Sequence, residues 1–95
     1  MIRRSWRHRK RALDAASPRS SLAHVPAGGT AVIRDLSSAP GWLRERLFAI
    51  GLFPGVRIRV ERRMPLGGPI VVSFDGQMFA LRPKDGRPIG VEVEP

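Results

Sequence analysis

The segment from Val56 to Glu61 constrains the fold more than any other part of the chain. Its apolar residues Val56, Ile58 and Val60 alternate strictly with charged residues. A period of two is typical of a β-strand that turns one face to a core and the other to water, as in many antiparallel sheets. The sequence therefore predicts a half-buried strand here.

Four other segments have the composition of short strands, namely residues 30–36, 70–74, 78–82 and 89–93. The dipeptide Asp75-Gly76 separates the second of these segments from the third, and it favours a tight hairpin turn. Residues 83–86, with Pro and Gly, break the chain before the last segment. The sequence thus predicts about five strands.

One helix is expected over residues 40–50. Pro40 suits its first turn, because proline lacks the N–H that would be unpaired there, and Gly51 suits a left-handed cap at its end. The side chains at helical spacing that we expect to face the core are Trp42, Leu43, Leu47 and Ile50, with Phe48 flanking them. About five strands and one short helix after the first strand predict a mainly β fold, a small and partly open barrel.

The chain of 95 residues has room for a single core, and so for one folded domain. It has no cysteine, which excludes disulfides, thiolate metal sites and cysteine nucleophiles. No stretch approaches the roughly 18 apolar residues of a membrane-spanning helix. These features are compatible with a small cytoplasmic domain that lacks a deep catalytic cavity.

The formal net charge of +9 is concentrated near the N-terminus. Residues 1–20 hold seven basic residues and one acidic residue, which leaves +6, whereas the remaining residues hold ten basic and seven acidic residues, which leaves +3. We expect residues 1–21 to form a basic, largely disordered tail and residues 22–95 to form the folded domain.

The basic tail has two interpretations. It could contact anionic lipid headgroups or the phosphates of a nucleic acid, with a tryptophan as an interfacial anchor. Alternatively, it is a solvated extension without a partner. The residues that would make such contacts are Arg3, Arg4, Trp6, Arg7, Arg9, Lys10 and Arg11.

The segment from Arg46 to Gly55 resembles a signature of the FeoA family. It reads RLFAIGLFPG, which is similar to the pattern RL-x-x-[ML]-G-[LMI]-x-PG of FeoA domains. The resemblance continues through a charged strand at residues 56–63, a PLGGP loop at residues 65–69 and a G-x-x-[IFV]-[AS]-L-R segment at residues 76–82. It covers roughly residues 22–94 and none of the basic tail.

This resemblance implies an SH3-like barrel that assists FeoB, a membrane transporter of ferrous iron with a cytoplasmic GTP-binding domain. It implies a non-catalytic accessory protein of ferrous iron uptake, without a cofactor, in the cytoplasm or at the inner face of the membrane. The module is also similar to a barrel of some iron- or manganese-dependent repressors. Since no helix-turn-helix segment precedes the barrel here, the repressor version is not expected.

Four apolar residues in loops are candidates for binding a partner: Leu52, Phe53, Met64 and Leu66. If they are exposed, they could anchor a protein interface, and together they could form one patch. Alternatively, residues 47–55 only cap a helix and launch a strand, and Met64 and Leu66 fold back to plug one end of the barrel.

The candidates for metal binding and catalysis are few. His8 and His24 are the only histidines, and neither has a carboxylate at a ligand-like spacing, so no built metal site is expected and His24 is the single candidate. No catalytic residue is expected, because Ser37 and Ser38 have no histidine nearby in sequence. The glycine pairs lack the ending of a phosphate-binding loop, so the chain is not expected to bind GTP.

Three alternatives remain open from the sequence. The net charge suits a small basic nucleic-acid-binding barrel, although Trp42 and Phe48 would be occupied at the helix interface and a stacking platform needs exposed aromatic rings. A metal-responsive regulator would need more ligands than the chain offers. Open strand edges could pair between two chains and give a weak homodimer.

Overall fold

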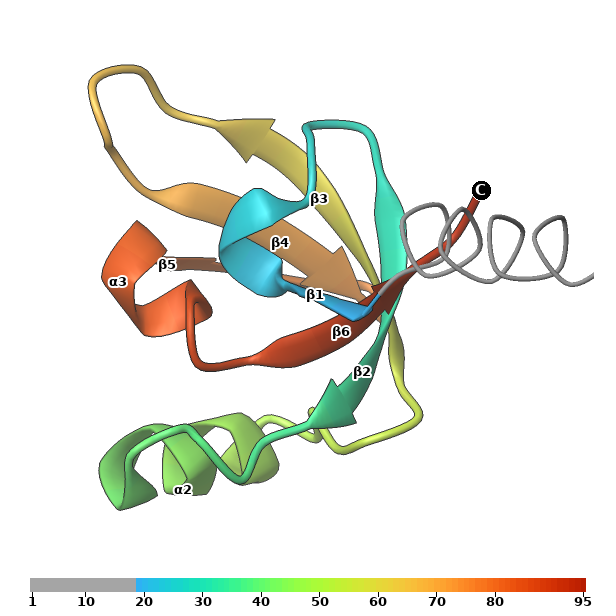
Figure 1. Cartoon of the computed structure of the whole chain (residues 1–95), viewed down its shortest axis with the longest axis vertical. Coiled ribbons are helices and arrows are strands. Elements are labelled where there is room, and N and C mark those ends of the chain that lie inside the picture. Colours follow the sequence, from blue (N-terminus) through green and yellow to red (C-terminus); the bar gives the residue numbers. More distant parts are fainter. Residues whose placement is uncertain (1–18) are drawn as a thin grey trace, which may run out of the picture.

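The computed structural model describes residues 19–95, so the predictions for the basic residues at positions 3–11 and for His8 lie outside the described part of the chain. Within residues 19–95, antiparallel strands form one sheet in the order β1-β6-β2-β3-β4-β5 (Figure 1). The strands are β1 (Arg19–Ser21), β2 (Thr30–Asp35), β3 (Arg57–Arg63), β4 (Ile70–Phe74), β5 (Gln77–Leu81) and β6 (Gly90–Val93). The helices are the 3-10 helix η1 (Leu22–His24), α2 (Gly41–Ala49) and α3 (Pro83–Gly86).

Two β-bulges bend this sheet into a barrel. The pairing of β2 with β6 shifts between Ile33 and Asp35, and the pairing of β3 with β4 shifts between Val60 and Arg62. An extra residue on one strand increases the local twist and bends the strand. The curved sheet encloses a single apolar core, to which α2 adds Leu43 and Leu47. The expected mainly β barrel is confirmed. The short helix was expected after the first of about five strands, and α2 follows β2, because β1 precedes the strand that was expected to be first.

The strict alternation of β3 reflects its two environments. Ile58 and Val60 are buried in the core, whereas Arg57 and Arg59 are exposed to water. Val56 lies just before the strand and packs against the core while partly exposed. The period of two thus predicted correctly which residues face inward.

The hairpin between β4 and β5 forms at the predicted dipeptide. Asp75 and Gly76 have φ angles of 48° and 76°, and Phe74 pairs with Gln77 across the turn. Positive φ at both central residues defines a type I′ turn, whose twist matches that of the flanking strands.

The N-terminal boundary of the folded part differs from the expectation. Arg19, Ser20 and Ser21 form β1 and pair with Glu92, Val91 and Gly90 of β6, so these residues do not belong to a disordered tail. The amide of Leu22 then donates to the carbonyl oxygen of Ile89 at 2.9 Å. The sheet therefore has a sixth strand, which the sequence did not reveal because its bonds are made by the main chain and its side chains are polar.

Residues 83–86 also differ from the expectation. They were predicted to be an irregular break, but they form the single helical turn α3, with Pro83 in its first turn. Proline is favoured there because its missing N–H has no partner in a first turn. No helix within residues 19–95 is long and apolar enough to cross a membrane.

Candidate functional site

Helix α2 presents one face to the core and another to the outside. Leu43 and Leu47, four residues apart, are buried, whereas Trp42 is 48% exposed and Phe48 is 41% exposed. The prediction that Trp42 faces the core, with Phe48 flanking it at the helix interface, is therefore wrong. A single nine-residue helix on a sheet can bury only one stripe of side chains, and the leucines occupy it.

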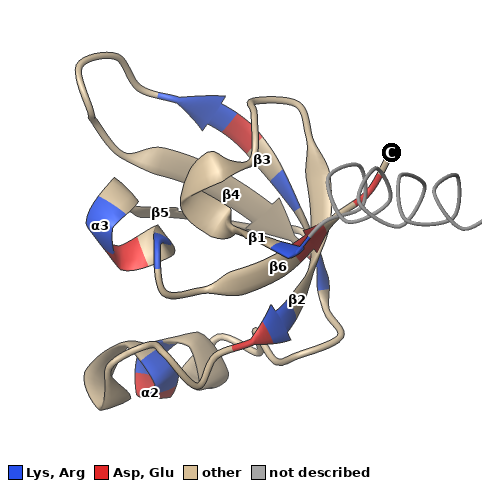
Figure 2. Cartoon of the chain, in the orientation of Figure 1, with Lys and Arg blue, Asp and Glu red and all other residues tan. Residues whose placement is uncertain are grey.

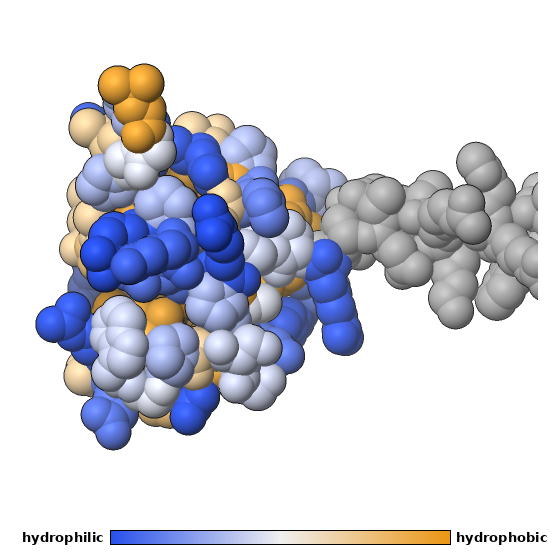
Figure 3. Space-filling view, turned by 60° about the vertical axis from the view of Figure 1, so that its left-hand side comes forward, coloured by the Kyte–Doolittle hydropathy of each residue, from blue (hydrophilic) through white to orange (hydrophobic). Residues whose placement is uncertain are grey.

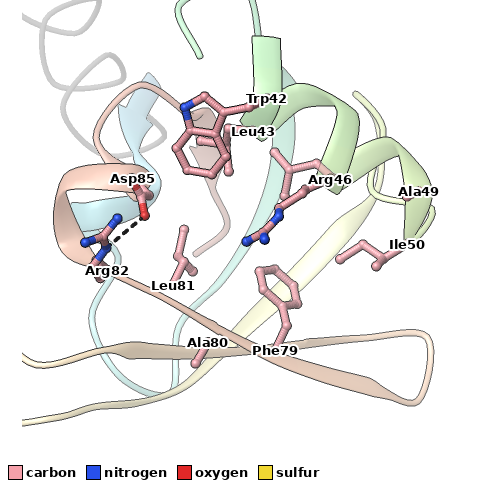
Figure 4. Close-up of a pocket in the computed structure, with 11 residues that line it drawn as sticks. Trp42, Leu43, Arg46, Ala49, Ile50, Phe79, Ala80, Leu81, Arg82 and Asp85 are labelled. Atoms are coloured by element: carbon pink, nitrogen blue, oxygen red, sulfur yellow. Dashed lines mark hydrogen bonds and ion pairs between the residues drawn. The ribbon is translucent and has the colours of Figure 1, made fainter. Parts of the chain in front are cut away.

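Helix α2 borders a cleft of about 540 Å³, to which its buried leucines as well as Trp42 and Arg46 contribute (Figure 4). Its opposite wall is strand β5 with the start of α3. Apolar side chains line most of it, with Trp42 and Ile50 on the helix side and Phe79 and Leu81 on the strand side. The helix and the strand thus leave an open apolar cleft between them.

The polar groups of the cleft are few, and two of them are paired. Arg82 contacts Asp85 of the same turn at 3.3 Å. The guanidinium of Arg46 lies 5.9 Å from the ring centre of Trp42 and is directed from α2 toward β5 (Figure 4). None of the ion pairs found among residues 19–95 includes Arg46. The cleft therefore combines apolar walls with one positive charge that has no acidic partner in the described part of the chain.

Leu52 is a core residue. It is 0% exposed and packs in the apolar cluster, so the expectation that it lies on an exposed turn is wrong. The cause is the helix end, where Gly51 has a φ angle of 91° and turns the chain so that Leu52 folds back under the helix. As a surface anchor for a partner, Leu52 is excluded.

Phe53 lies outside the core but is not isolated. Its ring stacks on that of Phe48, with the ring centres 5.3 Å apart and an angle of 17° between the planes. Both rings are partly exposed. The structure thus joins a predicted candidate, Phe53, to Phe48, which was expected to be occupied at the helix interface.

The loop between β3 and β4 carries the other predicted candidates, Met64 and Leu66. Both are exposed, and Leu66, with a φ angle of 58°, is fully exposed. The loop projects from one end of the molecule (Figure 1), and hydrophobic atoms stand out at that end (Figure 3). The alternative that these side chains plug the barrel is therefore wrong.

The predicted candidates do not form one patch. Phe53 precedes β3 and Met64 follows it, so the length of the strand, about 20 Å for seven extended residues, separates them. Figure 1 shows the two loops at opposite ends of the sheet. A strand joins these residues in sequence but keeps them apart in space.

Basic and acidic residues occur together on β2 and β3, and β6 carries an acidic residue (Figure 2). The ion pairs there join Arg34 to Glu92 at 2.8 Å, Arg57 to Glu94 at 2.8 Å and Arg59 to Glu61 at 3.4 Å. Within residues 19–95 the exposed arginines of β2 and β3 are thus partly neutralised by acidic neighbours on the same sheet.

His24, the candidate metal ligand, is exposed at the end of η1. Among the described residues, no group of three or more His, Asp or Glu side chains is arranged to hold a metal ion. Within that part of the chain, His24 therefore does not belong to a ligand cluster of this kind.

One curved antiparallel sheet with an apolar cleft beside a strand at its edge defines this chain as a small SH3-like barrel, the class to which one of its structural relatives is assigned. A model of the FeoA domain matches residues 20–93, so the chain belongs to the FeoA family. No curated protein sequence matches the chain significantly.

Solved structures agree with this assignment. The chain is similar to a FeoA protein of Chlorobium tepidum, with 31% identity and a TM-score of 0.73 over 79% of this chain and 70% of that protein. FeoA of Stenotrophomonas maltophilia, complexed with zinc and described as a prokaryotic SH3 domain protein, has 28% identity and a TM-score of 0.60 over 76% and 88%. A manganese-dependent transcriptional repressor, with 24% identity and a TM-score of 0.72 over 82% and 43%, shares the fold alone.

Sequence reasoning missed the cleft and its residues Trp42, Arg46 and Phe79. The sequence contained part of the information needed to find the cleft. A nine-residue helix with two aromatic residues and two leucines cannot bury all four side chains on one sheet, so some of them must be exposed. Which of them stays exposed depends on how the helix is rotated against the sheet, and periodicity does not give that rotation.

Proposed function

We propose that this protein is a non-catalytic accessory protein of ferrous iron uptake, which acts in the cytoplasm by binding and modulating a FeoB-type membrane iron transporter. Membership in the FeoA family supports the link to iron uptake. One relative is described as a candidate activating factor of bacterial ferrous iron transport. The observation that carries the binding role is the open apolar cleft between α2 and β5.

The cleft has the features of a protein docking site. Trp42 is half exposed at its rim, and tryptophan is among the residues that contribute most to interface energies when a partner buries it. Phe79 on the opposite wall is partly buried and packs against the core, which holds that wall in place. Phe53, Met64 and Leu66 remain proposed as contacts outside the cleft.

The chemistry of the lining supports binding. It includes one carboxylate, that of Asp85, and Arg82 holds that carboxylate. General acid–base catalysis usually relies on histidine or on carboxylates placed beside a reacting group. The lining contains no histidine, and its remaining side chains are mostly apolar.

Retention of the transporter on the immobilised protein tests this proposal. The baits are the full chain and its variants Trp42→Glu, Leu66→Glu and Arg57→Ala, each checked for folding by circular dichroism. The targets are the detergent-solubilised FeoB-type transporter of the same organism and its soluble GTP-binding domain. We expect Trp42→Glu to abolish retention, Leu66→Glu to reduce it, and Arg57→Ala, which changes an exposed ion pair away from the cleft, to leave it unchanged.

Failure of the wild-type chain to retain either target would contradict the proposal. Salt-sensitive retention on nucleic acid in the same assay would favour the alternative of a nucleic-acid-binding barrel. The sequence predicted few exposed aromatic rings, but Trp42, Phe48 and Phe53 are partly exposed and could stack on bases, which favours this alternative. The pairing of Arg34, Arg57 and Arg59 with acidic residues weakens it.

A further inference from the structure

We infer that the cleft holds its partner as an added β-strand, an extended segment with an acidic side chain that pairs with the free edge of β5. This deepens the proposed function, since it states how a partner is bound at the same cleft, but it does not require that partner to be an iron transporter. Strand β5 is the last strand of the sheet and pairs only with β4. Addition of a strand at such an edge is a common mode of peptide recognition.

The hairpin register shows which backbone groups of β5 are free. Gln77 pairs with Phe74 across a two-residue turn, and residues of antiparallel strands then alternate between bonded and non-bonded pairs. Gln77, Phe79 and Leu81 therefore direct their N–H and C=O groups to β4. Met78 and Ala80 direct theirs outward, and none of the hydrogen bonds found within residues 19–95 engages them.

This edge lacks the usual protection against pairing. Natural sheets often place lysine, proline or a bulge on an exposed edge strand. The sequence of β5 is QMFAL, without a charge or a proline, and its pairing with β4 is regular over all five residues. The opposite edge, β1, has only three residues and begins with Arg19.

An added strand would find a hollow on each of its two faces. Side chains of a strand point alternately to opposite sides. On one side lies the cleft of about 540 Å³ between β5 and α2. On the other side lies a hollow of about 420 Å³, where Met64, Val71 and Met78 are among the lining residues. Ala80 borders both hollows and marks the edge between them.

The charge of the cleft selects the kind of segment. Arg46 reaches across the cleft toward β5 and has no ion-pair partner within the described residues (Figure 4). An acidic side chain in the middle of the added strand, on the cleft side, would meet this guanidinium. Apolar side chains two residues to either side would then contact Trp42 and Phe79.

A second copy of the chain fits this site less well. Pairing of β5 with β5 would bring no carboxylate to Arg46, because β5 contains no acidic residue. The two acidic residues of β6 and its C-terminal extension, Glu92 and Glu94, already pair with Arg34 and Arg57. We therefore assign the site to an extended acidic segment of a different protein.

Fluorescence anisotropy with labelled peptides tests the inference on the full chain without any transporter. The first probe is the heptapeptide TVTETVT, which places two valines and a glutamate on one face of a strand. The second probe carries N-methyl groups on the amides that would donate to β5, and the third is TVTKTVT. We expect the first probe to bind, and the other two to bind about ten-fold more weakly or not at all, because each lacks a hydrogen bond or the attraction to Arg46.

Two protein variants at one position separate edge pairing from simple apolar contact. Ala80→Pro removes an outward N–H, and proline is tolerated where an edge strand faces away from its neighbour. Ala80→Ser keeps that N–H and serves as the matched control. We expect Ala80→Pro to lose about ten-fold in affinity for TVTETVT and Ala80→Ser to stay within about two-fold. Hydrogen exchange gives a second readout, since the bound peptide should protect the amides of Met78 and Ala80 in the wild-type chain.

Equal binding of the N-methylated probe, or unchanged exchange at Met78 and Ala80 when the probe is bound, would overturn strand addition. Concentration-dependent dimers that Ala80→Pro abolishes would overturn the choice of occupant in favour of a second copy. Binding of the transporter without binding of the probe would contradict strand addition and support the proposed function. Binding of the probe without binding of the transporter would support strand addition and contradict the proposed function.

Discussion

The amide of Leu52 donates a hydrogen bond to the carbonyl oxygen of Leu47, with nitrogen and oxygen 2.8 Å apart. The amide of Gly51 donates in parallel to Phe48 at 3.0 Å. These two bonds form the Schellman motif that ends α2, and they place Leu52 and Leu47 together in the core. The helix end thus connects a local turn to the packing of the whole barrel.

Leu52→Ala should destabilise the fold by about 2–5 kcal/mol, because a fully buried leucine leaves a cavity when it is truncated. Leu66→Ala is the matched control and should change the unfolding free energy by no more than about 0.5 kcal/mol, since Leu66 is fully exposed. Urea denaturation followed by circular dichroism measures both. Equal effects of the two substitutions would contradict the assignment of Leu52 to the core.

Gly51→Ala should cost about 1–2 kcal/mol, because Gly51 has a φ angle of 91° and a side chain is strained in the left-handed region. No atom lies within 4 Å of the added methyl group, so the cost is one of conformation alone. Gly41→Ala is the control, because Gly41 lies in the first turn of α2 with an ordinary φ and room for a methyl group. Gly41→Ala should be neutral or stabilising in the same denaturation experiment, and a matching loss at both positions would argue against the left-handed cap.

The stacked rings of Phe48 and Phe53 should contribute a coupling of about 0.5 kcal/mol, the lower end of the range for aromatic pairs, because both rings are partly exposed. A double-mutant cycle with Phe48→Leu, Phe53→Leu and the double variant measures this coupling. Strictly additive effects would mean that the rings do not interact in solution.

Asp35 should make the stability depend on pH in acid. Its carboxylate accepts hydrogen bonds from the hydroxyl and the amide of Ser37, and these bonds lower the pKa of Asp35. A lowered pKa in the folded state means that the contribution to stability is fully present above the ordinary carboxyl pKa of about 3.9 and is lost as the pH falls through the lowered value.

Asp35→Asn removes this titration. Between about pH 5 and about pH 2, the range in which an acidic carboxyl group titrates, the wild-type chain should lose more stability on acidification than the variant does. Thermal unfolding across this range measures the difference. Ser37→Ala is the control, because it removes the hydroxyl donor and should reduce the pH dependence without abolishing it. A variant with the same acid profile as the wild-type chain would contradict the role of Asp35.

The local elements of the fold were accessible from the sequence. The alternation around Ile58 and Val60, the hairpin at Asp75-Gly76 and the cap at Gly51 all appear in the structure where the sequence predicted them. Each depends on interactions between residues close in sequence, or on the preference of one residue type for a φ angle. The family resemblance rests on the same short segments, and the family match confirms it.

The candidate site was not accessible in the same way. Leu52 and Phe53 are adjacent apolar residues, yet one is buried and the other exposed, because the left-handed turn at Gly51 sends them in different directions. The cleft forms only because Trp42 is rotated away from the core while β5 lies opposite. No periodicity specifies that juxtaposition.

The sequence by itself determined that this chain forms a small barrel, since its alternating segments, turn glycines and single amphipathic helix admit few other arrangements. Tertiary structure alone decided that Arg19–Ser21 become a strand, because their pairing with β6 uses main-chain groups that every residue carries. The tertiary structure also determined that the edge strand β5 pairs on one side only and that α2 lies across the cleft from it. Free edges and clefts form between segments that are distant in sequence, and the packing of the whole core determines how these segments are arranged. Local conformational preference determines only the individual helices and strands.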